Sequence, residues 1–347
     1  MATLGPLTLS DERWSGPSTQ VAAVTGGRSR FSDAALAAPE AGVLRCGDAA
    51  GMMSGVRCRI RPFAAADDRE WVERLWQAAM PPSWPLLALG VALLGEGLVA
   101  EAASVPVGFV AMDMAGSIPL LLVDPACQRR GIGTSLLEAA LERVRAGGAT
   151  GVTAASGGSS YIWPGVPWDL PGAVRFFASR GWRHSHDSLD LVTDLGRYRP
   201  PPGARERAAS MGVTITLAAS GDLPGVRAFE AATFPSWARW FSAADRGILS
   251  ARDGAGDIAG TLLLDGPGAD TVFAPMLGPA AGTIGCVGVA PPRQGQGIGT
   301  ALVARASEIL RQAGTRNCHI GWTTRESFYR RAGYQPWRRY AMFCSPA

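Results

Sequence analysis

Two short glycine-rich segments, each between an apolar run and a predicted helix, are the residues of this sequence best suited to chemistry. The first reads Gln-Arg-Arg-Gly-Ile-Gly-Thr over residues 128–134, and the second reads Gln-Gly-Gln-Gly-Ile-Gly-Thr over residues 294–300. A helix that starts directly after such a loop presents backbone N–H groups without partners and a partial positive charge. Because glycine also lets a ligand approach the backbone closely, each loop predicts a cradle for a diphosphate.

The residues expected to bind this diphosphate are the loop residues themselves. Arginine side chains add cationic donors in the first loop, whereas the second is otherwise backbone, glycine and glutamine, flanked by Arg293. Neither loop has the Gly-x-Gly-x-x-Gly spacing of a dinucleotide fold or the lysine of a Walker loop. A plain strand–turn–helix connection is the alternative, and two copies in matching context argue against it. The candidates are Gln128, Arg129, Arg130, Gly131, Ile132, Gly133 and Thr134, and Gln294, Gly295, Gln296, Gly297, Ile298, Gly299 and Thr300.

The elements that must position these loops also occur twice. Pro82-Ser83-Trp84 returns at 235–237, and the segment 176–182 returns at 328–334, offsets of 152 or 153, whereas the loops are 166 positions apart. The second half therefore carries an insertion near 266–282, and the first carries one of similar size after its loop. Each half predicts a helix (67–80 or 222–233), a strand (117–124 or 283–290) and, after the loop, an amphipathic helix (134–146 or 300–313). A strand, a short helix and a closing strand complete each half.

Composition divides the chain into two folded units. Residues 1–55 are rich in Ala, Gly, Ser and Pro, and their apolar residues follow no sustained helical or strand period, which predicts a flexible leader. A second break at 196–212 contains three consecutive prolines, typical of a stiff spacer. We therefore expect an N-terminal domain at 56–195 and a C-terminal domain at 213–347, joined by a Pro-rich linker at 196–212.

Charge and residue usage exclude several classes of protein. All 33 basic residues of the 347 are arginine, so Walker-loop enzymes and pyridoxal enzymes, which need lysine, are excluded. A net charge of +4 without strong clustering does not indicate a nucleic-acid partner. The six cysteines form no C-x-x-C pair, and His184 and His186 have no third ligand, so we expect reduced thiols and no metal site. The sequence has no signal pattern and no run long enough to span a membrane, so we expect a cytoplasmic protein without membrane contact.

With these motifs, residues 56–347 resemble the GNAT acetyltransferase family. In that family a Gln/Arg-x-x-Gly-x-Gly/Ala loop holds the pyrophosphate of acetyl-coenzyme A. The resemblance implies a mixed α/β (α+β) fold with two tandem domains, each a central, mostly antiparallel sheet flanked by helices. It also implies that the strand residues before each loop bind the pantetheine arm through their backbone, and that the following strand splays away to make a thioester slot. These strand residues are Leu121, Leu122 and Val123, and Val287, Gly288 and Val289.

The resemblance further implies direct transfer of acetyl to the amine of a small-molecule acceptor. A backbone N–H near Val289 would polarise the carbonyl, and a Tyr four residues before the last-helix glycine would protonate the thiolate. That residue is Tyr329 in the second half but Phe177 in the first. A core aromatic is the alternative for Tyr329. Many family members have an Asn where this chain has Trp322, and the general base stays open between Glu230, Asp265 and a water relay.

We therefore expect an acetyl-CoA-dependent N-acetyltransferase whose C-terminal domain is catalytic and whose N-terminal domain is degenerate or binds only the cofactor. The alternative is a non-catalytic acyl-CoA-binding or scaffold module. Monomer and homodimer both stay open. The aromatic segment 161–168 and Trp84, Trp237 and Trp240 are candidates for acceptor-site walls, with a lid or ordinary core packing as the alternative.

Overall fold

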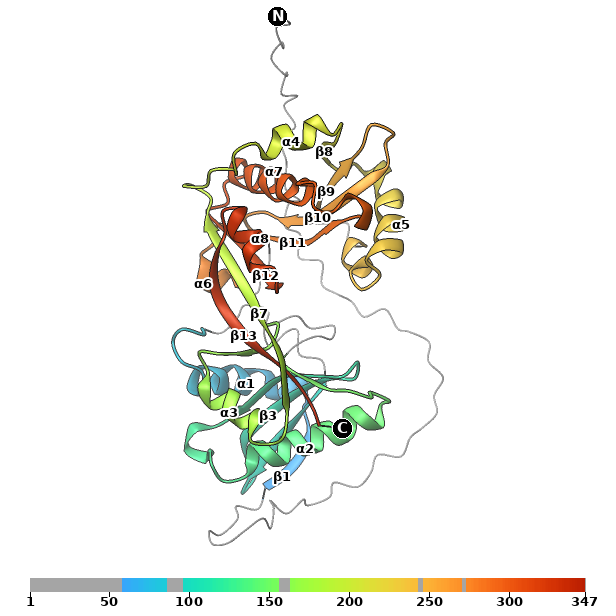
Figure 1. Cartoon of the computed structure of the whole chain (residues 1–347). Helices are drawn as coiled ribbons and strands as arrows, with labels where there is room; N and C mark the ends of the chain where they lie inside the picture. The colour runs from blue at the N-terminus through green and yellow to red at the C-terminus, as the bar shows by residue number, and fades with distance from the viewer. Residues whose placement is uncertain (1–57, 86–95, 156–162, 243–245, 270–272, 347) are drawn as a thin grey trace, which may run out of the picture.

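The computed structural model describes residues 58–85, 96–155, 163–242, 246–269 and 273–346 (Figure 1). The predicted leader 1–55 and Tyr161 of the aromatic segment lie outside the described residues. The first half consists of β1 (Cys58–Pro62), α1 (Ala65–Ala79), β2 (Glu96–Ala102), β3 (Val105–Asp113), β4 (Ser117–Val123), η1 (Pro125–Cys127), α2 (Ile132–Ala146), β5 (Thr153–Ala154), β6 (Val166–Pro167), α3 (Pro171–Ala178) and β7 (Arg183–Asp194).

The second half repeats this order and begins with one additional helix. Its elements are α4 (Ala204–Ser210), β8 (Thr214–Leu217), η2 (Ser220–Asp222), α5 (Leu223–Thr233), η3 (Ala238–Phe241), β9 (Gly247–Arg252), β10 (Ile258–Asp265), α6 (Ala274–Leu277), β11 (Ala281–Val289), η4 (Pro291–Arg293), α7 (Ile298–Gln312), β12 (Asn317–Thr323), α8 (Glu326–Arg331) and β13 (Gln335–Cys344). The predicted fold class, a mixed α/β chain built on a mostly antiparallel sheet, is confirmed. No helix in the described part is long and apolar enough to cross a membrane.

All of these strands belong to one 13-stranded sheet, with the order β1-β2-β3-β4-β5-β13-β7-β12-β11-β10-β9-β8 and β6 paired to β13. The order shows that the closing strands are exchanged between the halves. The last strand of the chain, β13, pairs with β5 of the first half, and β7 of the first half pairs with β12 of the second. Figure 1 shows β7 and β13 side by side as the connection between the two halves.

The amphipathic helices after the two loops pack on the sheet as their apolar spacing predicts. On α7 the buried residues include Leu302, Val303, Ala306 and Leu310, and on α2 they include Leu136, Leu137 and Ala140. Each half has its own main core on this side of the sheet, and the core of the first half also takes in Ala341 and Phe343 of β13. The first half is therefore complete only with the end of the chain.

A third core cluster joins the two halves on the face that α1 covers. It contains Trp76 and Trp84 of the first half together with Phe273 and Tyr340 of the second. Phe273 belongs to the insertion predicted near 266–282, and Met276 and Leu277 of α6 pack at the edge of the same cluster. The insertion of one half thus covers the aromatic core of the other.

Part of the segment predicted as a Pro-rich linker is helical and docked. Within 196–212, α4 buries Ala204 and Ala208, and Arg205 forms an ion pair with the buried Glu308 of α7. Before the helix, the Tyr198 hydroxyl donates to the Ala332 carbonyl at 3.1 Å. The boundaries 56–195 and 213–347 stay a prediction, since exchanged strands cross them.

Because β13 completes the first half, we expect Phe343→Ala to destabilise that half, although residue 343 follows the second half in sequence. Phe343 is buried and stacks on Phe177 with ring centroids 6.0 Å apart. Loss of a buried phenylalanine costs about 3–5 kcal/mol. Urea unfolding should show this loss, and hydrogen exchange should locate it in α2 and β4. The exposed Val105→Ala is the control; a loss of protection confined to the second half would contradict the strand exchange.

Candidate active site

In the second half, two parallel strands separate directly before the glycine-rich loop. β11 and β12 pair only from Ala281↔Asn317 to Ile284↔Ile320, and the rest of β11 continues without β12 beside it. The loop that follows contains Gly295 and Gly297 with φ of 76° and 94°, which glycine adopts without strain. Gly297 caps α7, and the first N–H bonded inside the helix is that of Ala301. The preceding N–H groups of the first turn have no acceptor within the helix, as a diphosphate cradle requires.

The loop glutamines hold the loop rather than reach outward. Gln294 Nε2 donates to the Val289 carbonyl at 3.0 Å, and Gln128 Nε2 donates to the Val123 carbonyl at 3.1 Å in the first half. Gln296 Nε2 likewise donates to the Pro292 carbonyl at 3.2 Å. These residues were expected to bind the cofactor. Their amide side chains are engaged within the loop, and the N–H groups of Gln128 and Gln294 donate to the Pro125 and Pro291 carbonyls. The N–H groups between each of these two residues and the first turn of the following helix are therefore the ones left for a ligand.

The first-half loop has the same backbone and more charge. Arg129 adopts a φ of 62° where the second loop has Gly295, and Gly131 caps α2 with a φ of 86°. Arg180 of the turn after α3 donates to the Thr134 hydroxyl and lies over the Phe176 ring, 3.7 Å from its centroid. Burial is the main cause that lowers the pKa of Arg180, and Arg129 nearby adds to the effect. Sequence reasoning missed Arg180 because it lies 46 residues from the loop.

The strands expected to bind the pantetheine arm differ between the halves. Gly285 of β11 is the counterpart of Pro119 by the 166-residue offset, and a Cβ added at Gly285 would meet open space. The register of β10 and β11 shifts between Thr261↔Gly288 and Leu263↔Gly285, and Cys286 in this bulge has a φ of 48°. Gly288 is required, because a Cβ there would lie 2.5 Å from the Phe234 ring.

In the first half the equivalent position is covered by Trp163. Its Nε1 donates to the Pro119 carbonyl at 2.9 Å, directly after Ile118, the last residue of β4 paired with β5. Trp163 is buried, stacks on Trp76 at 5.4 Å and meets the edge of Trp84. Of the aromatic segment, Trp163 is thus a lid on its own core, whereas Trp168 is exposed and donates to Asp187 at 2.8 Å. Among the other aromatic candidates, Trp84 is buried, and Trp237 is partly buried and stacks on Phe234 at 5.0 Å.

Tyr329 lies on α8, buried at the edge of the second core. Burial, with a smaller contribution from Cys286, raises the pKa of its hydroxyl, which therefore stays protonated at neutral pH. No described group exchanges a hydrogen bond with that hydroxyl. The other tyrosine hydroxyls of the described residues are all paired: Tyr198 with the Ala332 carbonyl, Tyr334 with Ser307 and Cys318, and Tyr340 with Asp190. A core tyrosine would be expected to have such a partner. Phe177, its counterpart, packs on Trp182 and Phe343.

A buried carboxyl lies beneath the same strand gap. Glu230 of α5 is fully buried and accepts a hydrogen bond from Thr261, whose strand partner is Gly288. Its second oxygen, Oε2, has no hydrogen-bond partner among the described residues. Burial raises the pKa of Glu230 to about 7, opposed by the bond from Thr261. Burial, and to a smaller extent the charge of Glu230, raises the pKa of the partly buried Cys286 thiol to about 12, and the contribution of Glu230 places that carboxyl near the bulge.

The other candidate base is already engaged. Asp265 of β10 accepts two hydrogen bonds from Arg246, at 3.0 and 2.5 Å, and one from Thr283 at 2.9 Å. The oxygens of Asp265 are therefore occupied by these donors. Of the two carboxyl groups named from the sequence, only Glu230 keeps an oxygen without a hydrogen-bond partner among the described residues.

The wall of the gap opposite β11 depends on the exchanged strand. Trp322, near the end of β12, has a φ of 53°, and its N–H donates to Asp190 of β7 at 3.0 Å. The fully buried Asp190 carboxylate also accepts from Tyr340 at 2.7 Å and lies 3.2 Å from Nε2 of His319. The first half thus positions a residue at the site of the second.

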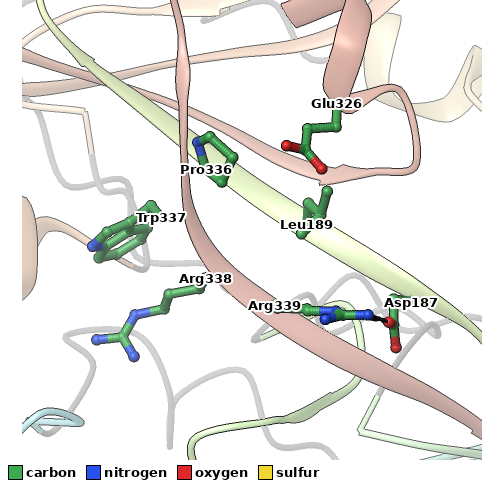
Figure 2. Close-up of a pocket in the computed structure, with 7 residues that line it drawn as sticks. All are labelled: Asp187, Leu189, Glu326, Pro336, Trp337, Arg338 and Arg339. Carbon is green, nitrogen blue, oxygen red and sulfur yellow. Dashed lines mark hydrogen bonds and ion pairs between the residues drawn. The ribbon is translucent and has the colours of Figure 1, made fainter. Parts of the chain in front are cut away.

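An open hollow of about 490 Å³ lies where β7 and β13 run together (Figure 2). Figure 2 shows Glu326 at the start of α8 pointing toward Leu189, on the side away from Trp337 and Arg338. Arg339 is tied to Asp187. No group of three His, Cys, Asp or Glu side chains in the described residues is arranged to hold a metal ion, and no disulfide joins two of the described cysteines.

Comparison with known proteins agrees with this geometry. A family model described as acetyltransferase (GNAT) domain matches residues 94–184 and 244–336, together just over half of the chain. The chain is 28% identical over 221 residues to the mycothiol acetyltransferase of Clavibacter sepedonicus, covering 59% of this chain and 64% of that protein. It is 27% identical over 210 residues to that of Clavibacter michiganensis subsp. michiganensis, covering 56% and 60%. The matches span less than two thirds of these relatives.

Solved structures show the same fold. The GCN5-related glucosamine N-acetyltransferase region of a fungal multi-domain β-N-acetylglucosaminidase has a TM-score of 0.78 and 27% identity, covering 86% of this chain and 39% of that chain. A tandem GNAT protein from the clavulanic acid biosynthesis pathway has a TM-score of 0.57 and 19% identity, covering 84% of this chain and 99% of that chain. The second match shows the fold alone.

The buried Glu230 predicts a pH-dependent stability. Because its pKa is about 7 in the folded protein and 4.5 for an ordinary Glu, the folded state binds the proton more tightly. The contribution of Glu230 to the free energy of unfolding is therefore fully present below pH 4.5 and is lost as the pH rises through 7, by about 3 kcal/mol at about 1.4 kcal/mol per unit. Urea unfolding at pH 4.5 and 8 should show this loss, and Glu230→Gln should remove it. The exposed Glu70→Gln is the control. Parallel pH dependences of wild type and Glu230→Gln would contradict the assignment.

Proposed function

This chain belongs to the acetyltransferase (GNAT) family, and from that premise we propose that it is an acetyl-CoA-dependent N-acetyltransferase acting on the amine of a small molecule, with catalysis in the second half. The observation that carries the proposal is the contrast between the two strand gaps. The second has open space at Gly285, a Tyr329 hydroxyl without a hydrogen-bond partner among the described residues, and the buried carboxyl of Glu230, whose Oε2 has no such partner either. The first has the bonded Trp163 and, in place of Tyr329, the packed Phe177.

Acetyl-CoA supplies the acetyl group as a thioester, and the residues present fit its binding. The backbone N–H groups of Gly295–Thr300 would hold its diphosphate, and the exposed backbone of Val287–Val289 would hold its arm. The equivalent groups of the first half, Leu121–Val123 and the loop from Gln128, support cofactor binding there without chemistry. These roles support a degenerate first half that positions the second.

The proton transfers follow from the two ionisable groups. Glu230, with a pKa near 7, would accept the proton of the acceptor amine as the C–N bond forms. Tyr329, kept protonated by burial, would donate its proton to the departing sulfur as the C–S bond breaks. A backbone N–H of the β11 bulge, where Cys286 turns the chain, would stabilise the charge on the carbonyl oxygen.

The acceptor is proposed only as a class. One similar protein is named for mycothiol and another for glucosamine, and both names denote acetyl transfer to a small molecule. A non-catalytic acyl-CoA-binding or scaffold module is the competing function. Release of free thiol from acetyl-CoA with a panel of small amines separates the two, since a binding module would release none beyond the rate without protein.

For Tyr329→Phe we expect kcat to fall by about 10²–10⁴-fold, the usual contribution of a general acid, with affinity for acetyl-CoA near normal. Stability should change little, because the lost hydroxyl has no hydrogen-bond partner in the part of the chain that the structure describes. Tyr334→Phe is the matched control: it removes a paired, buried hydroxyl and should cost stability without this loss of rate. Phe177→Tyr should change little.

The opposite result would reassign the chemistry. If Tyr329→Phe is silent while changes at Trp163 or Trp168 abolish turnover, the first half is the catalytic one.

For Glu230→Gln we expect kcat/KM to fall within a similar span of about 10²–10⁴-fold. In the wild type, kcat/KM should rise with pH through about 7, because the base acts in its deprotonated form. Steady-state rates between pH 5 and 9 measure this rise, the acidic limb of the pH profile, and Glu230→Gln should lose that limb. Asp265→Asn is the comparison and should keep the limb. A limb that persists in Glu230→Gln would assign the ionisation to another group.

A further inference from the structure

A cation from outside the glycine-rich loop lies against the second cradle. Arg207 of α4 approaches Gly297 so closely that a Cβ on that glycine would lie 3.7 Å from Nε of Arg207 and 3.9 Å from its Cδ. Gly297 is the cap of α7, where the unpaired N–H groups begin. The guanidinium is therefore beside the position at which the cradle would hold a diphosphate.

Arg207 is exposed and free to bind an anion. Within the described part of the chain, its side chain donates one hydrogen bond, from Nη2 to the Pro202 carbonyl at 3.3 Å. No carboxylate among the described residues forms an ion pair with it. Arg205, two positions earlier on the same helix, is by contrast paired with Glu308. A guanidinium without a counterion at the mouth of a backbone anion cradle has the chemistry of a phosphate ligand.

The position of Arg207 is set by packing. The helix that carries it buries Ala204 and Ala208 against the second half, and the Arg205–Glu308 pair ties it to α7. The carbonyl of Gly203, at the start of this helix, accepts the Arg207 N–H at 3.1 Å. The backbone of Arg207 is therefore held by a docked helix and does not depend on a ligand for its place.

The two loops also differ in the charge that they need. The first loop carries Arg129 and Arg130, whereas the second has Gly295 and Gln296 at these positions. A doubly charged diphosphate would thus meet two loop cations in the first half and none within the second loop itself. A side chain from elsewhere must supply the charge if the second cradle is to bind as tightly.

We propose that Arg207 binds the diphosphate of the acyl-CoA donor in the second half, so that the segment between the halves contributes a ligand to the active site. This inference rests on the proposed function. Arg207 replaces from outside the loop the cations that the second loop lacks, and α4 serves as its support.

Calorimetry on the full chain tests this, in the Gly131→Glu background so that only the second cradle binds. Arg207→Gln should raise the Kd of acetyl-CoA about tenfold, as expected for the loss of one charge-assisted hydrogen bond. The same rise should appear with 3′-dephospho-CoA, which keeps the diphosphate. The rise should be absent with S-acetylpantetheine, which has no phosphate group. Arg207→Lys should give an intermediate Kd for acetyl-CoA.

Arg311→Gln is the matched control, because it removes the same charge from the last turn of α7, about 20 Å along the helix from the cradle. Its Kd should stay near that of the background. Three results would each overturn the role of Arg207. The first is an equal loss of affinity for acetyl-CoA in Arg311→Gln and Arg207→Gln. The others are a loss of affinity in Arg207→Gln that persists with S-acetylpantetheine, and no loss of affinity at all. Gly297→Glu separates this from the proposed function. If Gly297→Glu abolishes the binding of acetyl-CoA while Arg207→Gln does not weaken it, the cradle assignment stands and only the role of Arg207 is wrong. If Gly297→Glu binds acetyl-CoA normally, the cradle assignment and the role of Arg207 are both wrong.

Discussion

The antiparallel pairing of β7 with β13 is the constraint on which the rest of this molecule depends. The two strands pair from Gln335↔Val192 to Cys344↔Arg183, and each then joins the sheet of the other half. Two sheets that would each end in an exposed edge are thereby joined into one, which leaves no unpaired edge at their junction. Neither half can open at this point without breaking the hydrogen bonds of the other.

At the centre of this junction lies a buried charge. Asp190 is fully buried, and its carboxylate is satisfied by Tyr340 and by the N–H of Trp322, with His319 beside it. An isolated carboxylate in such a place would be costly, so its partners must be held in position. They come from β12 and β13, both of the second half. The same bonds that stabilise the charge therefore fix the two halves in one register and hold Trp322 at the gap.

The repeated pattern of the sequence was sufficient to predict the elements and the two loops. Apolar spacing predicted the helices that became α2 and α7, because a helix on a sheet needs one continuous apolar face. It could not predict the exchange of the closing strands, because the apolar pattern of β7 and β13 is compatible with pairing in either half. A strand's partner is decided by long-range packing, such as that of Phe343 on Phe177.

The candidate site was predictable where chemistry is local in sequence, and not where it depends on burial. The loops and Tyr329 follow from short motifs. The preference for Glu230 over Asp265 needed the structure, because it depends on which carboxyl is desolvated and which is paired with Arg246. Arg180 and Arg207 were equally invisible, each being distant in sequence from the loop that it faces.

The difference between the halves has a single physical origin in how their strand gaps are filled. In the first, Trp163 and Trp76 fill the region beside β4 with aromatic rings, and the insertion of the second half adds Phe273 to the same cluster. This burial of apolar surface stabilises the junction and removes the room that a substrate would need. In the second half the matching cluster around Val226 and Phe241 is small, and Oε2 of Glu230, on the same helix as Val226, has no hydrogen-bond partner among the described residues. Unpaired polar groups cost stability, and a protein retains them where they act on a ligand. The first half is thus packed for stability, and this contrast between a filled strand gap and an open one is the physical basis on which we propose catalysis in the second half.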